Sequence, residues 1–252
     1  MITNEINELY NSSLVVQNAE IKDVILLHGL FGSLSNWYTV KKELSGAYNI
    51  YTPKLPLYEV SLREGKLDAL VRFLDSYIVE NGMERATLVG NSLGGHIALL
   101  YTLKYPQKVE RLVLAGSSGL YENSFNGTFP RVKDYDYIAD KVKQTFYKKE
   151  VVSDELIAEV FETVQSKVKT LSIIALARAA QKQNLTAVLH QIKAPVLLIW
   201  GLQDEVTPPH VAVQFEKLLP NAELCFIDEC GHVPMMEQPE LFNKYLKEFL
   251  ES

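Results

Sequence analysis

ATLVGNSLGG, at positions 86–95, is the stretch of sequence that decides the fold of this chain. It opens with a short apolar run, the pattern of a β-strand that is buried on both faces. A Gly-x-Ser-x-Gly pentad follows at once, and residues 93–105 then have a helical pattern. Glycines on both sides of a serine allow a sharp strand-to-helix turn, which exposes the hydroxyl group as a nucleophile. The stretch therefore predicts Ser92 as a nucleophile and the backbone N–H of Leu93 as an oxyanion donor at a helix N-terminus.

Further apolar runs occur on both sides of this stretch. Buried strands are predicted at 24–27, 111–115 and 195–200, and weaker ones at 49–51 and 224–227. Apolar residues at helical spacing lie between them, in 67–78 and in 241–250. Strands that alternate with helices predict the α/β class, with a mostly parallel central sheet flanked by helices.

The alternation breaks between about residues 119 and 190, where helical stretches such as 154–183 replace buried strands. We therefore expect an inserted helical cap at 119–190, in a core formed by 1–118 and 191–252. The segment 123–130 contains Asn, Ser, Gly, Thr and Pro close together and is typical of a flexible entrance to such an insertion.

The predicted cap carries three candidate substrate-binding residues. Leu171 and Ile174 belong to a helix that is apolar on more than one side, which fits either packing on the core or the roof of an acyl pocket. Arg178 lies on the same helix and could receive a substrate carboxylate, although a solvated surface charge is the alternative.

A serine hydroxyl needs a base, and His232 is the best placed of the five histidines. It lies in a loop between the last predicted strand and the last helix, at the carboxyl ends of the strands. The acid that orients it should follow a strand and lie between the serine and the histidine in the chain. Asp204, four residues after a strong strand, meets both conditions, and Glu205 and Asp228 are its rivals.

The second oxyanion donor is expected in HGLFGS at 28–33, directly after the first strong strand. Its glycines allow the backbone N–H of Leu30 to turn inward, with that of Phe31 as the alternative. His28 would orient this loop through its ring nitrogens. Phe31 and Trp37 are candidates for lining the substrate pocket, and packing beneath the pocket is the other reading of Trp37.

These motifs together resemble those of the α/β-hydrolase superfamily, in particular its esterase- and lipase-like members with a helical cap. The resemblance covers residue 24 to the C-terminus apart from the insertion. Asn91, before the serine, is similar to the residue found in hydrolases of meta-cleavage products, which split carbon–carbon bonds. Those enzymes usually carry Trp where this chain has Val233. The resemblance places Asn91 and Val233 near the substrate. The motifs that carry it are His28-Gly29 with Gly32, Gly90-Asn91-Ser92-Leu93-Gly94-Gly95, Trp200-Gly201-x-x-Asp204 with Pro208, and Gly231-His232 followed by Glu237 and Pro239.

Two other reactive residue types are expected to be structural. His96 lies one helical turn after Ser92, where packing within the core is favoured over catalysis. Cys230 lies two residues before His232, and loop packing is the simpler role because the serine already accounts for that histidine.

Composition excludes several other classes of protein. The 252 residues are 47% hydrophobic and 22% charged, which argues against collagen, coiled coil and disorder. The net charge of −6 disfavours non-specific nucleic-acid binding. Two cysteines, no signal peptide pattern and no apolar run of about 20 residues predict a cytoplasmic protein outside the membrane. No metal-ligand spacing or phosphate loop occurs, so no cofactor is expected.

The sequence thus predicts a serine hydrolase that cleaves a small-molecule carboxylic ester through an acyl-enzyme. Two alternatives stay open. One is carbon–carbon hydrolysis of a dienoate acid, supported by Asn91 and Arg178. The other is a ligand receptor or binding module on the same fold. The oligomeric state is left open.

Overall fold

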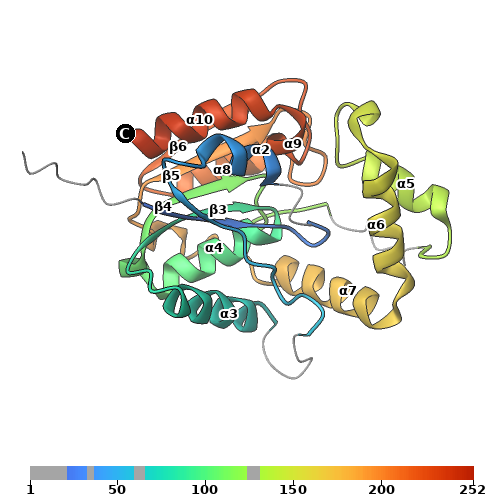
Figure 1. The fold of residues 1–252 in the computed structure, drawn as a ribbon, viewed down its shortest axis with the longest axis horizontal. Helices are drawn as coiled ribbons and strands as arrows, with labels where there is room; N and C mark the ends of the chain where they lie inside the picture. The colour runs from blue at the N-terminus through green and yellow to red at the C-terminus, as the bar shows by residue number, and fades with distance from the viewer. Residues whose placement is uncertain (1–21, 33–36, 60–65, 124–130) are drawn as a thin grey trace, which may run out of the picture.

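The computed structural model describes residues 22–32, 37–59, 66–123 and 131–252. At its centre, the described strands form a six-stranded sheet in the order β2-β1-β3-β4-β5-β6, with every neighbouring pair parallel (Figure 1). Every strand predicted from the sequence is present, the two weak ones included. The strands are β1 (Asp23–Leu27), β2 (Asn49–Tyr51), β3 (Ala86–Asn91), β4 (Val109–Ala115), β5 (Val196–Gly201) and β6 (Ala222–Ile227).

Two apolar layers cover the sheet, because successive side chains of a strand point to opposite faces. Ile25 and Leu27 enter one layer, and Val24 and Leu26 enter the other. The first layer is closed by α3 (Lys66–Glu80), α4 (Leu93–Lys104) and α8 (Pro209–Leu218), with η2 (Pro106–Lys108) following α4. The second layer is closed by α2 (Tyr38–Leu44), α9 (Pro234–Glu237) and α10 (Pro239–Glu251).

A helical insertion separates β4 from β5 and lies to one side of the sheet (Figure 1). The stretch 154–183, read as helical from the sequence, is two helices with a break at Ser166, whose side chain accepts the N–H of Lys169 as an N-cap. Most of the predicted entrance, 124–130, lies outside the described residues. The insertion contains α5 (Tyr135–Lys143), η4 (Lys149–Val151), α6 (Asp154–Gln165), α7 (Lys167–Lys182) and η5 (Leu189–Gln191).

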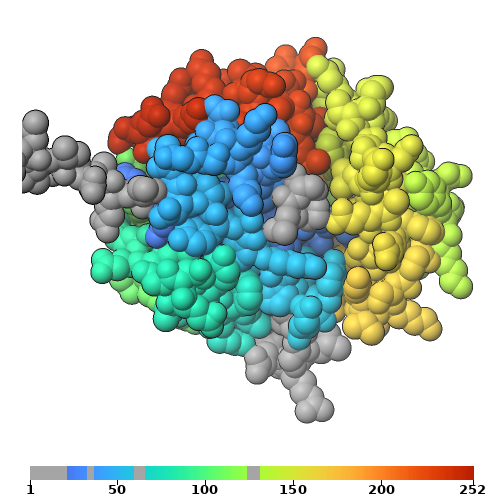
Figure 2. Space-filling model, in the orientation of Figure 1, coloured from blue at the N-terminus to red at the C-terminus, as the bar shows by residue number. Residues whose placement is uncertain are grey.

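The insertion is joined to the core through α7. Leu176 of this helix is fully buried and belongs to the same apolar layer as α3 and α4. Figure 2 shows the insertion packed along the core, against segments from both the N-terminal and the C-terminal parts of the chain. Part of the apolar surface of α7 is therefore used for docking.

All strands are parallel, so their carboxyl ends meet at one edge of the sheet, where α/β folds bind their ligands. Ser92, Asp204 and His232 all follow the ends of strands on this side. Among the helices that the structure describes, none is both long enough and apolar enough to span a bilayer.

Candidate active site

Ser92 lies at the turn between β3 and α4, with φ of 54° and ψ of −119°. A positive φ is uncommon for a residue with a side chain and marks a strained backbone. The turn is compact, and a Cβ atom at Gly90 would lie 2.5 Å from the Gly95 nitrogen. A Cβ atom at Gly94 would lie 2.2 Å from the Leu27 carbonyl oxygen. The glycines predicted from the sequence are thus required by close contacts between backbones.

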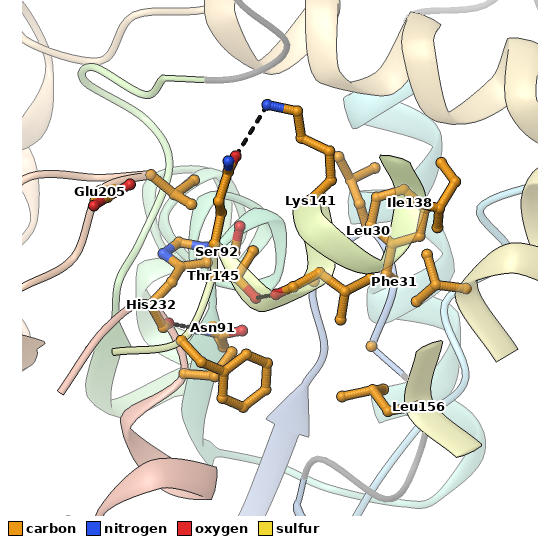
Figure 3. Close-up of a pocket in the computed structure, with 18 of the residues that line it drawn as sticks. Leu30, Phe31, Asn91, Ser92, Ile138, Lys141, Thr145, Leu156, Glu205 and His232 are labelled. Carbon is orange, nitrogen blue, oxygen red and sulfur yellow. Dashed lines mark hydrogen bonds between the residues drawn. The ribbon is translucent and has the colours of Figure 1, made fainter. Parts of the chain in front are cut away.

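His232 forms a buried pair with Asp204. Its Nδ1 lies 2.9 Å from Oδ2 of Asp204 and 3.2 Å from Oδ1. A ring nitrogen that faces a carboxylate carries its hydrogen, so Nε2 is left as the acceptor. The close-up in Figure 3 shows the His232 ring beside Ser92. The ring is therefore oriented as a base for a neighbouring hydroxyl group.

The environment of His232 favours its protonated form. Burial lowers the pKa of its imidazole, but the charge and hydrogen bond of Asp204, followed by the charges of Glu122 and Glu237, outweigh burial and raise the pKa above 6.5. A base with a raised pKa accepts a proton more readily, as long as it is neutral when the reaction begins.

Asp204 is held rigidly by the loop that follows β5. Its Oδ1 accepts the backbone N–H groups of Val206 and Thr207 at 2.8 and 2.9 Å, and its Oδ2 accepts the Thr207 hydroxyl at 2.8 Å. The rival acids lie elsewhere. Glu205 is exposed at the cavity, and Asp228 is exposed and accepts an N–H of Gln203 at 2.8 Å.

Asn91 connects the serine turn to the histidine loop. Its Nδ2 donates to the carbonyl oxygens of Ala115 at 2.9 Å and of His232 at 3.1 Å, the latter shown in Figure 3. Its side chain is buried and lies at the cavity. The amide thus ties the backbone of the candidate base to the end of β3, a contact that the sequence did not reveal.

Two backbone segments beside Ser92 carry the N–H groups that the sequence predicts as oxyanion donors. The first hydrogen bond of α4 runs from His96 N–H to Ser92 O. The N–H of Leu93 comes before it in the chain and so has no acceptor within the helix. On the other side, Gly29 approaches Ser92 so closely that a Cβ atom there would lie 3.2 Å from the Cβ of Ser92. This approach brings the Leu30 turn to the cavity next to the serine.

His28 orients that turn, as its position predicted. Its Nδ1 lies 2.8 Å from the Gly29 carbonyl oxygen and its Nε2 accepts the Leu55 N–H at 3.0 Å. Burial lowers the pKa of the ring, so it stays neutral near pH 7. Both nitrogens are occupied, so the ring acts as a brace for the loop.

A cavity of about 680 Å³ opens above Ser92, between the core and the insertion. Its volume is in the range that holds a small organic ligand. Polar groups lie near its mouth, among them Lys141, whose Nζ donates to Gln144 Oε1 at 2.9 Å (Figure 3). The insertion contributes many apolar side chains to the lining, namely Ile138, Val142, Phe146, Leu156, Val160, Val164, Ile173 and Ile174.

The predicted lining residues divide into two groups. Phe31, Asn91, Ile174 and Val233 lie at the cavity, as expected from the sequence. Three others do not lie at this cavity of the described residues, and for them the sequence-based assignment is corrected. They are Trp37, Leu171 and Arg178.

Each correction has a physical reason. Trp37 is 1% exposed and packs on Phe242 with ring centroids 6.2 Å apart, so it belongs to the core beneath the site. Leu171 and Arg178 are seven residues apart, which places them on one face of α7, and that face is turned to solvent. Leu171 is 57% exposed, whereas Ile174 lies on the neighbouring face, toward the cavity.

Sequence reasoning missed the contribution of α5 and the residues after it. Ile138 and Val142 are four residues apart on α5, and Thr145 and Phe146 follow its end; all four line the cavity. The i, i+4 spacing was a visible signal, although it could not show which ligand or layer the stripe would face.

His96 and Cys230 take the structural roles expected of them. His96 is fully buried in α4, and burial lowers the pKa of its ring to about 4. Cys230 is fully buried as well, and burial raises the pKa of its thiol, which leaves it unreactive. Within the described part of the chain, no three His, Cys, Asp or Glu side chains gather in a way that could hold a metal ion.

Comparisons with known proteins agree with this fold. The model of the alpha/beta hydrolase family matches residues 24–245. The 2-hydroxy-6-oxononadienedioate/2-hydroxy-6-oxononatrienedioate hydrolase of Paraburkholderia phymatum is 28% identical over 260 residues, covering 90% of this chain and 86% of that protein. The pimeloyl-(acyl-carrier protein) methyl ester esterase of Nitrosomonas europaea is 28% identical over 236 residues, covering 87% and 92%. The solved structure of an alpha/beta hydrolase enzyme from a sediment metagenome of the Mar Chica lagoon, Morocco, is 38% identical, with a TM-score of 0.74 and coverage of 92% and 91%.

Proposed function

The chain belongs to the α/β-hydrolase family, and we propose that it is a serine hydrolase that cleaves a carboxylic ester through Ser92, His232 and Asp204. The observation that carries this proposal is the His232–Asp204 pair at 2.9 Å, which faces a serine on a strained turn at the floor of an apolar cavity. A free nitrogen on an oriented imidazole is what a serine hydroxyl requires to become a nucleophile.

The reaction would begin when Ser92 Oγ attacks the ester carbonyl carbon and His232 Nε2 takes the hydroxyl proton. The imidazolium that forms keeps its hydrogen on Nδ1 and donates it in a hydrogen bond to Asp204, whose buried negative charge stabilises the new positive charge. The carbonyl oxygen becomes an oxyanion, and the N–H groups of Leu93 and Leu30 would donate to it. His232 then returns the proton to the leaving alcohol, which departs and leaves an acyl group on Ser92.

Water completes the cycle. His232, neutral again, removes a proton from a water molecule that attacks the acyl carbonyl carbon, and the same two N–H groups stabilise the second oxyanion. Transfer of the proton back to Ser92 Oγ releases the acid. No step requires a group other than these residues and water.

The apolar walls contributed by α5, α6 and α7 support an acyl group that is itself apolar. We further propose that the insertion, residues 119–190, acts as a cap that selects the acyl group and supplies no reacting atom. In support, Ser92, Asp204 and His232 all lie on the core.

A second candidate function is carbon–carbon hydrolysis of a dienoate acid. The relative from Paraburkholderia phymatum favours it by its name, and so does Lys141, the only lysine or arginine among the described residues that line the cavity. With Arg178 turned to solvent, a substrate carboxylate would have Lys141 as its partner.

An ester panel separates these functions. The wild-type protein would be treated with a fluorophosphonate probe and assayed on p-nitrophenyl esters from acetate to octanoate, alongside a 2-hydroxy-6-oxo dienoate. Labelling of Ser92 together with ester turnover supports the esterase. Preference for the dienoate, lost in Lys141→Gln, indicates carbon–carbon cleavage. Labelling without turnover of either class indicates a binding module, and absence of labelling contradicts the serine mechanism.

The cap proposal predicts a change in acyl-length preference for Ile174→Ala. Shortening this side chain leaves a gap in the apolar wall. Transition-state binding of medium acyl esters, measured through kcat/KM, should therefore weaken by about 1–3 kcal/mol, whereas kcat/KM for acetate should change little. Leu171→Ala on the solvent face of the same helix is the matched control and should leave the profile unchanged. Equal profiles for all three proteins would show that the insertion does not select the acyl group.

A further inference from the structure

The histidine loop, residues 228–233, is bonded directly to the insertion. The backbone N–H of His232 donates to the carbonyl oxygen of Thr145 at 2.9 Å. Thr145 lies just after α5, so this hydrogen bond joins the candidate base to a segment that is remote in the sequence. The position of His232 therefore depends on the insertion as well as on the core.

Glu237, the last residue of α9, makes a second connection at the same place. Its Oε1 accepts the Gly231 N–H at 2.8 Å and its Oε2 accepts the Tyr147 N–H at 2.7 Å. One carboxylate thus bridges the residue before His232 and the second residue after Thr145. Each carboxylate oxygen thus accepts one N–H, and hydrogen bonds from N–H groups to a carboxylate are strong contacts.

The absence of a side chain at Gly231 makes this close approach possible. A Cβ atom there would lie 2.8 Å from Thr145 O, 2.9 Å from Tyr147 N and 3.0 Å from Glu237 Oε1. Any larger residue would separate the three groups, so the loop and the insertion meet with their backbones in contact.

The same segment of the insertion lines the cavity. Thr145 and Phe146 both lie at its wall, and the Thr145 hydroxyl donates to the Val142 carbonyl oxygen at 2.7 Å. A substrate in the cavity would therefore lie against Thr145, whose carbonyl oxygen accepts the N–H of His232. Glu237 accepts hydrogen bonds from both segments, so it can transmit a displacement of the insertion to the base.

We propose that Glu237 is a positioning residue that fastens the insertion to the histidine loop and so keeps His232 aligned with Ser92. This inference rests on the proposed role of His232 as the base. Glu237 itself touches neither substrate nor the reacting atoms. Its contribution is to fix the backbone beside His232 through the Gly231 N–H, in addition to the hydrogen bond from Asn91 to the His232 carbonyl oxygen.

The charge of Glu237 also reaches His232. The carboxylates that face the imidazole are Asp204, Glu122 and Glu237, and all three raise its pKa against the lowering effect of burial. The Lys148 ammonium near Glu237 is paired with Glu229 at 2.7 Å in an exposed ion pair. Loss of the Glu237 charge should therefore lower the pKa of His232, which a merely structural contact would not do.

The test is the rate at which a fluorophosphonate probe labels Ser92 in Glu237→Gln. A neutral amide cannot accept both N–H groups, so one connection is lost and the base is displaced. We expect labelling and ester kcat to fall by about 10- to 100-fold, because small displacements of catalytic groups have effects of this size. The acidic limb of the pH profile should move to lower pH, and Asp228→Asn, exposed on the same loop and bonded to Gln203 of the core, should match the wild type.

A second pair of variants keeps the carboxylate charge. Tyr147→Pro removes the Tyr147 N–H that donates to Glu237, and Tyr147→Ala, which retains that N–H, is the reference for loss of the side chain. We expect Tyr147→Pro to label more slowly than Tyr147→Ala, with the acidic limb in place. This pair also serves as the test if Glu237→Gln does not fold, as judged by its thermal unfolding.

Two results would overturn the inference. One is a folded Glu237→Gln protein that labels at the wild-type rate with an unchanged acidic limb. The other, if that variant does not fold, is equal labelling of Tyr147→Pro and Tyr147→Ala. Failure of the serine mechanism is a different observation, because the wild-type protein would then not be labelled at Ser92 at all.

Discussion

Replacing Ser92 with alanine is expected to abolish covalent labelling and to lower ester kcat by roughly 10⁴- to 10⁶-fold. The hydroxyl oxygen is the atom that would attack the carbonyl carbon in the proposed mechanism, so its removal leaves the base without a nucleophile to activate. Alanine adopts the same strained turn without adding a contact, so the fold should persist. Intact-protein mass spectrometry after probe treatment and steady-state kinetics measure the two effects.

Ser117→Ala is the matched control for this change. Ser117 is also buried next to the turn, where its hydroxyl donates to the Ser118 carbonyl oxygen at 2.8 Å. We expect it to be labelled like the wild type. Labelling that persists in Ser92→Ala would remove Ser92 from the mechanism.

Replacing Asp204 with asparagine is expected to lower kcat by roughly 10³- to 10⁴-fold. An amide NH₂ group in place of a carboxylate oxygen would face Nδ1 of His232, and the ring would then carry its hydrogen on Nε2, where it cannot accept the Ser92 proton. Glu205→Gln and Asp228→Asn are the comparisons and should cost little, because both side chains are exposed. If Glu205→Gln or Asp228→Asn lowered kcat to this extent instead, the assignment of Asp204 as the acid would be wrong.

The pH dependence of kcat/KM tests the pairing of His232 with Asp204 independently. His232 must be neutral to act as a base, so kcat/KM should fall as the pH drops through its pKa, which lies above 6.5 in the folded protein. Asparagine at position 204 removes the main influence that raises this pKa and leaves burial, which lowers it. The acidic limb of Asp204→Asn should therefore lie at lower pH than that of the wild type. If the acidic limb of Asp204→Asn lies at the same pH as that of the wild type, a group other than His232 is responsible for it.

Much of the fold and the site was readable from local patterns. The buried strands stood out because a strand covered on both faces must be apolar throughout. The short β2 gave a weaker signal, because Asn49 is exposed and Ile50 and Tyr51 are half-buried. Ser92 was recognised because its turn needs glycines at fixed distances, and the clashes at Gly90 and Gly94 show why. Asp204 and His232 followed from their positions after strand ends.

The walls of the cavity were harder to predict. Leu171, Ile174 and Leu176 look alike in the sequence, yet one is exposed, one lines the cavity and one belongs to the core. The rotation of α7 about its axis and its docking on the core decide the environment of each residue. An apolar stripe alone does not indicate which part of the protein it will contact. For the same reason Trp37 proved to pack on Phe242.

The sequence by itself determined the class of fold, the turn that presents Ser92 and the order of the groups that follow the strands. Each of these depends on contacts between residues that are near in the chain, or on the simple period of a strand or helix. Only the tertiary structure decided which insertion residues face the cavity, that Asn91 holds the His232 carbonyl group, and that Glu237 bridges Gly231 and Tyr147. These contacts join segments far apart in the chain, and their partners are chosen by how the insertion docks on the core, which no local pattern encodes.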